Sequence, residues 1–353
     1  MDSLPMTKRE LGIEEPPLAD REPREAVQPH SPGHPSPRLS LREQLLRRRR
    51  PLEFFVETSI KIVALVSIAA IILILVFIGK EALPVFTSHE ISEEVGPLFA
   101  SVESDGTAVT AWQPVSELPK HNVWPLIVGS LKVTLVAMAF AAPLAVAAAV
   151  YVAELASKKT RELIKPALEL LAGVPSVVIG FFALVVLATI VQSVFGAQHR
   201  LNSIVAGLGL AFAIAPIVFT VSEDALRAVP NGFRVAADAL GASRTQTVLR
   251  VVLPAAVPGI GAALVLGFGR AIGETMVVLL ASGNAALLSP ELGVSARTIT
   301  ATIAQELGET VVGSAHYHVL FALGVMLFLV TLVLNLAGQW AIGRARRSLT
   351  GGS

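Results

Sequence analysis

The chain of 353 residues contains no cysteine and few charged residues. Without cysteine it can form no disulfide and no thiolate metal site. Charged residues make up 16% of the sequence, against roughly 25% in soluble domains, whereas 53% of its residues are hydrophobic. This imbalance excludes an ordinary soluble protein and indicates a polytopic membrane protein.

Two motifs that would give the chain its own catalytic site are also missing. A P-loop needs Gly-x4-Gly-Lys followed by Ser or Thr, because its lysine reaches the nucleotide phosphates. The one Gly-Lys pair, Gly79-Lys80, precedes Glu81, and no lysine follows Lys165. The seven histidines form no His-Glu-x-x-His motif of a metalloprotease. We therefore expect no ATP site of the P-loop type, no metal site and no catalytic residue.

Six apolar runs are each long enough to cross a hydrocarbon core about 30 Å thick. They predict an all-α polytopic membrane protein with six transmembrane helices. Lys132 lies near the start of the second run, and we expect its side chain to reach outward to water. The runs cover Ile62–Gly79, about Leu126–Ala153, about Leu168–Val194, Ser203–Val221, Gly259–Ser282 and Val319–Ile342.

Basic residues are distributed unevenly among the connecting segments. The alternate loops, which include residues 80–125 and 283–318, hold few of them. Because basic residues favour the cytoplasmic side of a membrane, we expect both termini in the cytoplasm and these two loops in the periplasm. The basic residues of the other connecting segments are Lys158, Lys159, Arg161, Lys165, Arg227, Arg234, Arg244, Arg250, Arg344, Arg346 and Arg347.

The segments outside the apolar runs set the domain boundaries. Residues 1–54 are rich in proline and in charges of both signs, a composition that buries no core, and predict a disordered cytoplasmic tail. Its run Arg47–Arg50 is interpreted as an anchor on the cytoplasmic side of the first helix rather than as a nucleic-acid site. Residues 55–343 form the six-helix domain, and residues 344–353 a cytoplasmic C-terminal tail.

The cytoplasmic loop of residues 224–258 carries a regular pattern. Asn231 and the residues after it predict the start of a short helix, which Gly241 ends because glycine readily adopts the left-handed cap. A second amphipathic helix over residues 243–253 follows, and we expect Pro254 to stop it. Two short helices joined by a glycine turn at the membrane surface are suited to docking a partner protein.

This loop resembles that of the permease subunits of bacterial ABC importers, whose pattern is Glu-Ala-Ala, three residues, Gly, nine residues, Ile-x-Leu-Pro. Val235 replaces the glutamate and Val251 the isoleucine. The resemblance implies a type I ABC importer permease architecture and an ATPase docked on this loop. The matching residues are Ala236, Ala237, Gly241, Val251, Leu253 and Pro254.

Two further stretches, "GRAIGETM" (residues 269–276) and "ELLAGVPSVVIG" (residues 169–180), are similar to the phosphate importers, and to the PstC-like permeases among them. The resemblance implies a subunit of the bacterial inner membrane that translocates inorganic phosphate and binds no cofactor and no nucleic acid. It also implies as partners a PstA-like second permease, two PstB-like ATPase subunits that hold ATP and Mg, and a PstS-like periplasmic phosphate-binding protein, besides membrane lipid.

Arg270 and Glu274 lie inside the fifth apolar run, near its middle, where a charge costs at least about 2.5–3.5 kcal/mol. Four positions apart, they would share one helix face, and the order of basic before acidic residue is the less favourable one for an ion pair. A guanidinium donates two parallel hydrogen bonds to an oxyanion. We interpret Arg270 as an anion contact and Glu274 as its tuning partner, with Thr275 and Ser176 as further candidates along the pathway.

Several alternatives remain open at this point. The pair of Arg270 and Glu274 fits a structural ion pair as well. An ion-coupled secondary anion transporter also uses intramembrane charges, although it has no need for the patterned loop. A membrane scaffold would leave both residues unexplained. Another oxyanion would serve in place of phosphate, and the acidic loop of residues 80–125 would either pack against the binding protein or form a solvated cover.

Overall fold

A computed structural model of the chain describes residues 51–100, 102–104, 107–116 and 119–349. The predicted N-terminal tail up to residue 50 and the end of the C-terminal tail, residues 350–353, lie outside them. The chain divides into two units, residues 1–66 and 67–353. In the first unit, the described residues form the first half of helix α2 (Pro51–Ala82). There Lys61 Nζ lies 2.7 Å from Glu57 Oε1, one turn away.

Within the described residues, six helical runs are long and apolar enough to span a membrane, which confirms the predicted number. The first, second, fourth and sixth of them include the whole of the apolar runs predicted there. The six runs are Phe54–Thr87, Trp124–Leu155, Ser176–Val194, Ser203–Arg227, Arg244–Ile272 and Ala315–Arg344.

The second unit is helical apart from four short strands. Three π-helical turns, η3 (Tyr151–Leu155), η4 (Ala183–Leu187) and η5 (Val248–Val252), continue or join α-helices. The α-helices after α2 are α3 (Pro84–Thr87), α4 (His89–Val95), α5 (Trp124–Val150), α6 (Lys158–Ala172), α7 (Ser176–Phe182), α8 (Ala188–Phe195), α9 (Ser203–Arg227), α10 (Asn231–Ala239), α11 (Arg244–Thr247), α12 (Leu253–Ile272), α13 (Met276–Ala281), α14 (Ile299–Glu306) and α15 (Ala315–Leu349).

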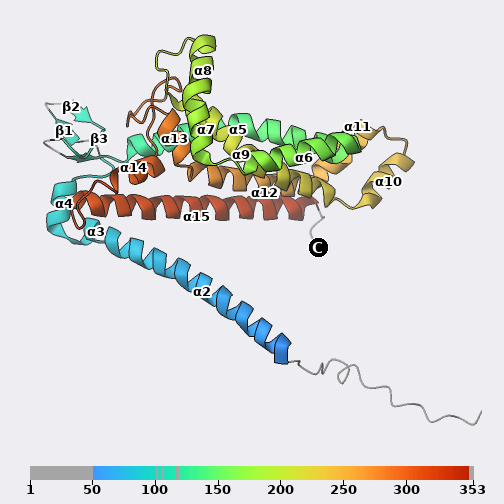
Figure 1. The fold of residues 1–353 in the computed structure, drawn as a ribbon, viewed down its shortest axis with the longest axis horizontal. Coiled ribbons are helices and arrows are strands. Elements are labelled where there is room, and N and C mark those ends of the chain that lie inside the picture. The colour runs from blue at the N-terminus through green and yellow to red at the C-terminus, as the bar shows by residue number, and fades with distance from the viewer. Residues whose placement is uncertain (1–50, 101, 105–106, 117–118, 350–353) are drawn as a thin grey trace, which may run out of the picture. The chain divides into compact units, whose positions relative to one another are not determined.

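In this unit α5, α9, α12 and α15 run alongside one another, whereas α7 and α8 lie across their direction (Figure 1). Small residues allow the close approach. A Cβ atom on Gly207 of α9 would lie 2.4 Å from Val136 of α5, and one on Gly338 of α15 would lie 2.5 Å from Val265 of α12. Because membrane helices associate through such close packing, these contacts explain the abundance of glycine and alanine in the spans.

The two ends of the second unit are built differently. At one, which we call the hairpin end, lie α3, α4, α14 and the strands (Figure 1). There β1 (Val102–Ser104) pairs antiparallel with β2 (Thr107–Val109), and β3 (Trp112–Gln113) with β4 (Lys120–His121). At the other end lie α10 and α11 (Figure 1). We call the loop of residues 224–258, which contains them, the coupling loop, and this end the coupling-loop end.

The third span differs from the prediction of one helix over residues 168–194. Helix α6 ends at Ala172, and α7 begins at Ser176 after a break at Gly173, Val174 and Pro175. Pro175 precedes α7 directly, where its missing N–H costs no intrahelical bond, and it disfavours helical dihedrals in the residue before it. Helix α6, which carries four basic residues, packs along α9 as a separate element.

The fifth span also differs from its prediction, because Pro254 does not stop the second helix of the coupling loop. Helices α11 and α12 continue through the π-turn η5, so the span runs over Arg244–Ile272 instead of 259–282. Pro254 falls in the first turn of α12. Proline is tolerated there because it directly follows the π-turn, and such local adjustments of the hydrogen-bond pattern accommodate a proline inside a membrane helix.

Lys132 does not reach outward as predicted, since it is only 8% exposed. Its Nζ donates a hydrogen bond to the Ser289 carbonyl at 3.0 Å. The chain after α13 folds back over α5, where Ile299 N also donates to Ser130 Oγ at 3.1 Å. This loop supplies the buried ammonium with a carbonyl partner, and its position could not be read from hydropathy.

Candidate functional site

The turn between α10 and α11 has the geometry that the sequence predicts. Gly241 adopts φ +78°, a left-handed conformation that costs other residues strain. Ser243 then caps α11 in a capping box with Gln246, each side chain bonding to the other residue's backbone N–H. At the start of α10, Asn231 is the first helical residue and no side chain caps it. The expected cap by Asn231 is therefore absent, while the helix and its glycine stop are confirmed.

An ion pair that the sequence did not reveal holds α10 in place. Arg234 Nη2 lies 2.5 Å from Glu154 Oε1, and Arg234 Nε donates to Oε2 at 3.3 Å. The same guanidinium donates to the carbonyls of Val229 at 2.7 Å and Leu226 at 3.0 Å. The hydrogen bond with Glu154 raises the pKa of Arg234. The sequence offered two hints of this pair: Glu154 is a carboxylate at the end of the second span, and Arg234 lies in the basic loop after the fourth.

The residues of the permease pattern differ in their exposure to solvent. Ala237 is buried, whereas Ala236, Gly241 and Pro254 are exposed, and Val251 and Leu253 are half-buried. Beside them, α10 and its end leave apolar side chains in the open: Phe233 is 53% exposed, Val235 59% and Leu240 90%. Such a patch on a short helix is suited to burial by another protein.

Arg270 and Glu274 lie on two sides of a helix end. Arg270 is exposed in the last turn of α12, which ends at Ile272 with Gly273 as its cap, and Glu274 follows in the link to α13. The expectation that both share one continuous helix is therefore wrong, because the glycine ends the helix between them. No ion pair joins them in the part of the chain that the structure describes.

The packing of α12 against α15 sets the depth of Arg270. Gly269 lies opposite Asn335, whose Oδ1 is 3.5 Å from the position of an added Cβ atom. At 1.5 Å per residue, Asn335 is about 30 Å along α15 from Ala315 and about 14 Å from Arg344, the two ends of that span. Arg270 is next to Gly269 in the chain, so it lies within the length of the sixth span rather than at either of its ends.

The other two predicted pathway residues flank the same region. Thr275 is half-buried in the link before α13, and its Oγ1 lies 3.5 Å from the Gly273 carbonyl. Ser176 is the half-buried first residue of α7, which packs against α13. A Cβ atom on Gly180 of α7 would lie 3.1 Å from the Met276 carbonyl. The fold thus brings the elements that carry these residues together, without a recorded contact between Ser176 and Arg270.

A cluster of polar side chains closes the hairpin end, and no pattern in the sequence indicates it. At its centre Glu306 accepts from Trp112 Nε1 at 3.2 Å and lies 2.9 Å from Arg297 Nη1 and 3.1 Å from His316 Nε2. The ring of His121 lies 5.4 Å from that of His316. Burial lowers the pKa of His121, because desolvation disfavours the imidazolium. Helix α14, which carries Glu306, also donates a hydrogen bond to the link after α12, from Thr300 Oγ1 to the Glu274 carbonyl at 2.9 Å.

Comparison with known families decides the class of the protein. Residues 141–349, more than half of the chain, match the family described as the binding-protein-dependent transport system inner membrane component. The chain belongs to this family. It is accordingly a multi-pass membrane permease subunit of a bacterial ABC importer.

Individual relatives in the family cover most of the chain. It is 33% identical over 284 residues to the probable ABC transporter permease protein YqgH of Bacillus subtilis, covering 80% of this chain and 88% of that protein. It is also 33% identical over 296 residues to the phosphate transport system permease protein PstC of Mesorhizobium japonicum, covering 78% of this chain and 88% of the relative.

Solved structures of ABC importers share the fold. One chain of a bacterial alginate ABC transporter, in complex with an alginate pentasaccharide-bound periplasmic protein, aligns with a TM-score of 0.57 at 18% identity. The alignment covers 84% of this chain and 95% of that one. The six spanning helices thus form a type I ABC importer permease, as the loop pattern implies.

Proposed function

We propose that this permease translocates inorganic phosphate across the bacterial inner membrane, with Arg270 as the anion contact. The observation that carries the proposal is a guanidinium at membrane depth, exposed on the chain's own surface and joined to no carboxylate among the described residues. Intramembrane arginines face a protein interior or a water-filled path. The similarity to PstC supports phosphate as the anion.

The chemistry of the region suits a divalent oxyanion. The arginine fork donates two parallel hydrogen bonds to a phosphate group. A lone cation in a low-dielectric site would hold a divalent anion too strongly for release, because Coulomb attraction grows as the dielectric constant falls. Glu274, in the link beyond the helix end, weakens that hold by its negative charge, and the hydroxyls of Thr275 and Ser176 supply neutral hydrogen bonds along the path.

The proposal includes the partners of a phosphate importer. A PstA-like second permease would cover the exposed face that carries Arg270, and a PstS-like binding protein would deliver phosphate to the hairpin end on the periplasmic side. Two PstB-like ATPase subunits, which hold ATP and Mg, would drive transport, one of them docked on the apolar surface of Phe233, Val235 and Leu240. Both termini would then be cytoplasmic.

Uptake by the reconstituted transporter tests the anion contact. Arg270→Gln should lower phosphate uptake about a hundredfold or more, the order of loss when one charged donor is removed from a preorganised site. Arg270→Lys should restore only part, because an ammonium lacks the fork. Complex yield should stay at the wild-type level, and Arg200→Gln, at an exposed arginine before α9, should transport normally.

The double variant Arg270→Gln/Glu274→Gln separates this role from a structural pair. A structural pair would make each single variant unstable and the double variant stable and active. Recovered uptake in the double variant would therefore contradict the proposal. Uptake of sulfate or another oxyanion in place of phosphate would keep the role of Arg270 and change the substrate.

A further inference from the structure

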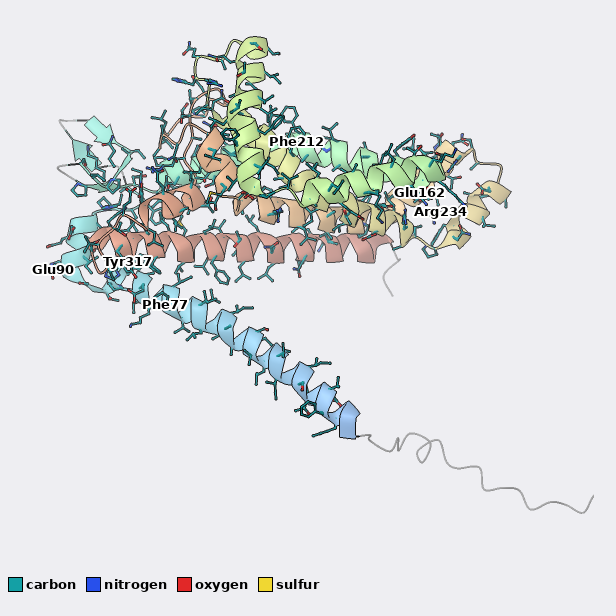
Figure 2. The ribbon with its side chains drawn as sticks, in the orientation of Figure 1. Phe77, Glu90, Glu162, Phe212, Arg234 and Tyr317 are labelled. Carbon is teal, nitrogen blue, oxygen red and sulfur yellow. The ribbon has the colours of Figure 1, made fainter. Side chains whose placement is uncertain are left out.

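A polar cavity of about 490 Å³ lies at the coupling-loop end, where α6, α9 and α10 meet. Three arginines line it, Arg161, Arg227 and Arg234, together with Asn231 and a single carboxylate, Glu154. Figure 2 labels Arg234 at this end of the unit. Three guanidinium groups from three elements therefore converge on one space.

The lining keeps positive charge after its internal pairs are made. Arg234 is matched by Glu154. Arg227 Nη2 lies 2.5 Å from Glu223 Oε1, but Lys165 Nζ also lies 3.5 Å from this fully buried carboxylate. Within the described part of the chain, Arg161 donates to the backbone carbonyls of residues 152 and 153 and pairs with no carboxylate. Among the described charges around the cavity, cations thus outnumber carboxylates, and the space favours an anion.

The first turn of α10 adds to this preference. The helix has nine residues, no side-chain cap, and its first residue, Asn231, lines the cavity. Free N–H groups at a helix N-terminus and the positive end of its dipole attract anions, phosphates in particular.

An apolar groove of about 740 Å³ continues from the same place. It runs between the end of α9, α10, the first turns of α12 and Ile342 of α15. Three residues, Ala228, Val229 and Pro230, line both the polar cavity and this groove. A site for a free ion would need no apolar extension, whereas a phosphate group attached to a hydrocarbon chain fills both parts.

We propose that this composite site binds one anionic phospholipid, with its phosphate on Arg161 and Arg227 and an acyl chain in the groove. The positions agree with a lipid of the leaflet next to α10, since Arg227 ends the fourth span and Arg244 begins the fifth. Because the site adjoins α10, the bound lipid also packs under the helix on which an ATPase would dock.

Native mass spectrometry of the full-length permease in detergent tests the proposal. Phosphatidylglycerol, phosphatidylcholine and inorganic phosphate serve as probes at equal concentration. We expect one phosphatidylglycerol to remain bound and about tenfold weaker retention of phosphatidylcholine, the factor for roughly 1.4 kcal/mol of charge interaction. Arg161→Gln should weaken phosphatidylglycerol binding, and Ala228→Phe should do so by blocking the junction of the two parts.

Two further variants test whether a loss of lipid binding is specific to the arginines that line the cavity. Arg250→Gln removes an exposed arginine of the same loop that does not line the cavity, so lipid retention should not change. Because Arg227→Gln alone would leave a buried carboxylate short of a partner, the double variant Glu223→Gln/Arg227→Gln removes the cation with its counter-charge. It should weaken lipid binding without unfolding the chain.

Three outcomes would overturn the proposal. Equal retention of phosphatidylglycerol and phosphatidylcholine would mean that the arginines do not distinguish the two headgroups by their charge. Binding of inorganic phosphate that Arg161→Gln abolishes and Ala228→Phe leaves intact would mean a free-ion site. Retention by the isolated permease but not by the assembled transporter would mean that the ATPase, rather than a lipid, occupies the site.

Discussion

The hairpin end and the coupling-loop end use the same interaction to different effect. At the first, Glu306 pairs with Arg297, and both side chains are 13% exposed. At the second, Glu154 pairs with Arg234, at 10% and 21% exposure. The second pair ties α10 to the end of the second span. The first lies within the segment that carries α14, which His316 of α15 ties to a spanning helix through Glu306.

The surroundings of the two pairs differ. Around Glu306, the rings of Trp112 and His316 pack against each other, so this pair is enclosed by the chain's own side chains. Around α10, Phe233 and Leu240 stay exposed. The comparison shows that an ion pair positions a segment without deciding what covers it. The exposure of the other side chains around the pair shows whether the chain itself buries them or a partner would have to.

The largest expected effect is on stability at the hairpin end. Glu306→Gln would leave Arg297 as a buried cation without its carboxylate, which costs about 3–5 kcal/mol of unfolding free energy. Thermal unfolding in detergent should therefore occur at a clearly lower temperature. Glu309→Gln, at an exposed carboxylate three residues on, is the matched control and should unfold like the wild type. An unchanged midpoint for Glu306→Gln would mean that the cluster does not close this end.

At the coupling-loop end we expect a loss of coupling rather than of stability. Gly241→Val would place a β-branched residue at φ +78° and cost about 1–2 kcal/mol of local strain. Misplacement of α10 should lower phosphate uptake about tenfold relative to ATP hydrolysis, while membrane insertion survives.

Gly232→Val is the control for this variant, because Gly232 has no positive φ and an added Cβ meets nothing within 4 Å. Gly232→Val should leave the ratio of phosphate uptake to ATP hydrolysis at the wild-type value. Normal uptake by Gly241→Val would show that the turn does not place the docking surface.

The smallest expected effect is a pH dependence confined to the hairpin end. The pKa of His121 is lowered in the folded state, with burial the main cause and His316 adding repulsion, while the Val95 carbonyl and Glu306 oppose the shift. The unfolded state then binds more protons between that lowered value and about 6.5, so stability falls as pH falls through this window.

Unfolding midpoints measured from pH 7.5 down to about 5 check this slope. His121→Gln should flatten it, and His89→Gln, at an exposed histidine of α4, should leave it unchanged. A slope that persists in His121→Gln would assign the titration to other groups.

Local patterns in the sequence were sufficient for much of this fold. Apolar length gave the six spans, and the spacing from Ala236 to Pro254 gave the family and the turn at Gly241. Both features depend on residues close together in the chain. The position of Arg270 was predicted less well, because the structure places it in the last turn of α12, near the end of the fifth span rather than near its middle.

The features that were missed depend on distant contacts or on competition between local signals. Trp112 and Glu306 are 194 positions apart, and Lys132 meets Ser289 across 157 positions. Neither pairing has a periodic signature. The break at Gly273 was missed because the apolar composition of the run predicted one continuous helix. Hydropathy indicates which residues lie in lipid, but it does not indicate where a helix ends.

The π-turn η5 has a consequence for how this chain tolerates change. A π-turn holds one residue more than an α-helical turn, and each residue advances a helix by about 100°. Because the π-turn already holds this extra residue, deleting one residue from η5 would let it close into an ordinary α-helical turn, with α11 and α12 near their present orientation. Deleting a residue from the α-helical part of α12 would instead rotate the chain beyond it by about 100° and take Arg270 off its exposed face. Single deletions should therefore be tolerated in η5 and not in α12.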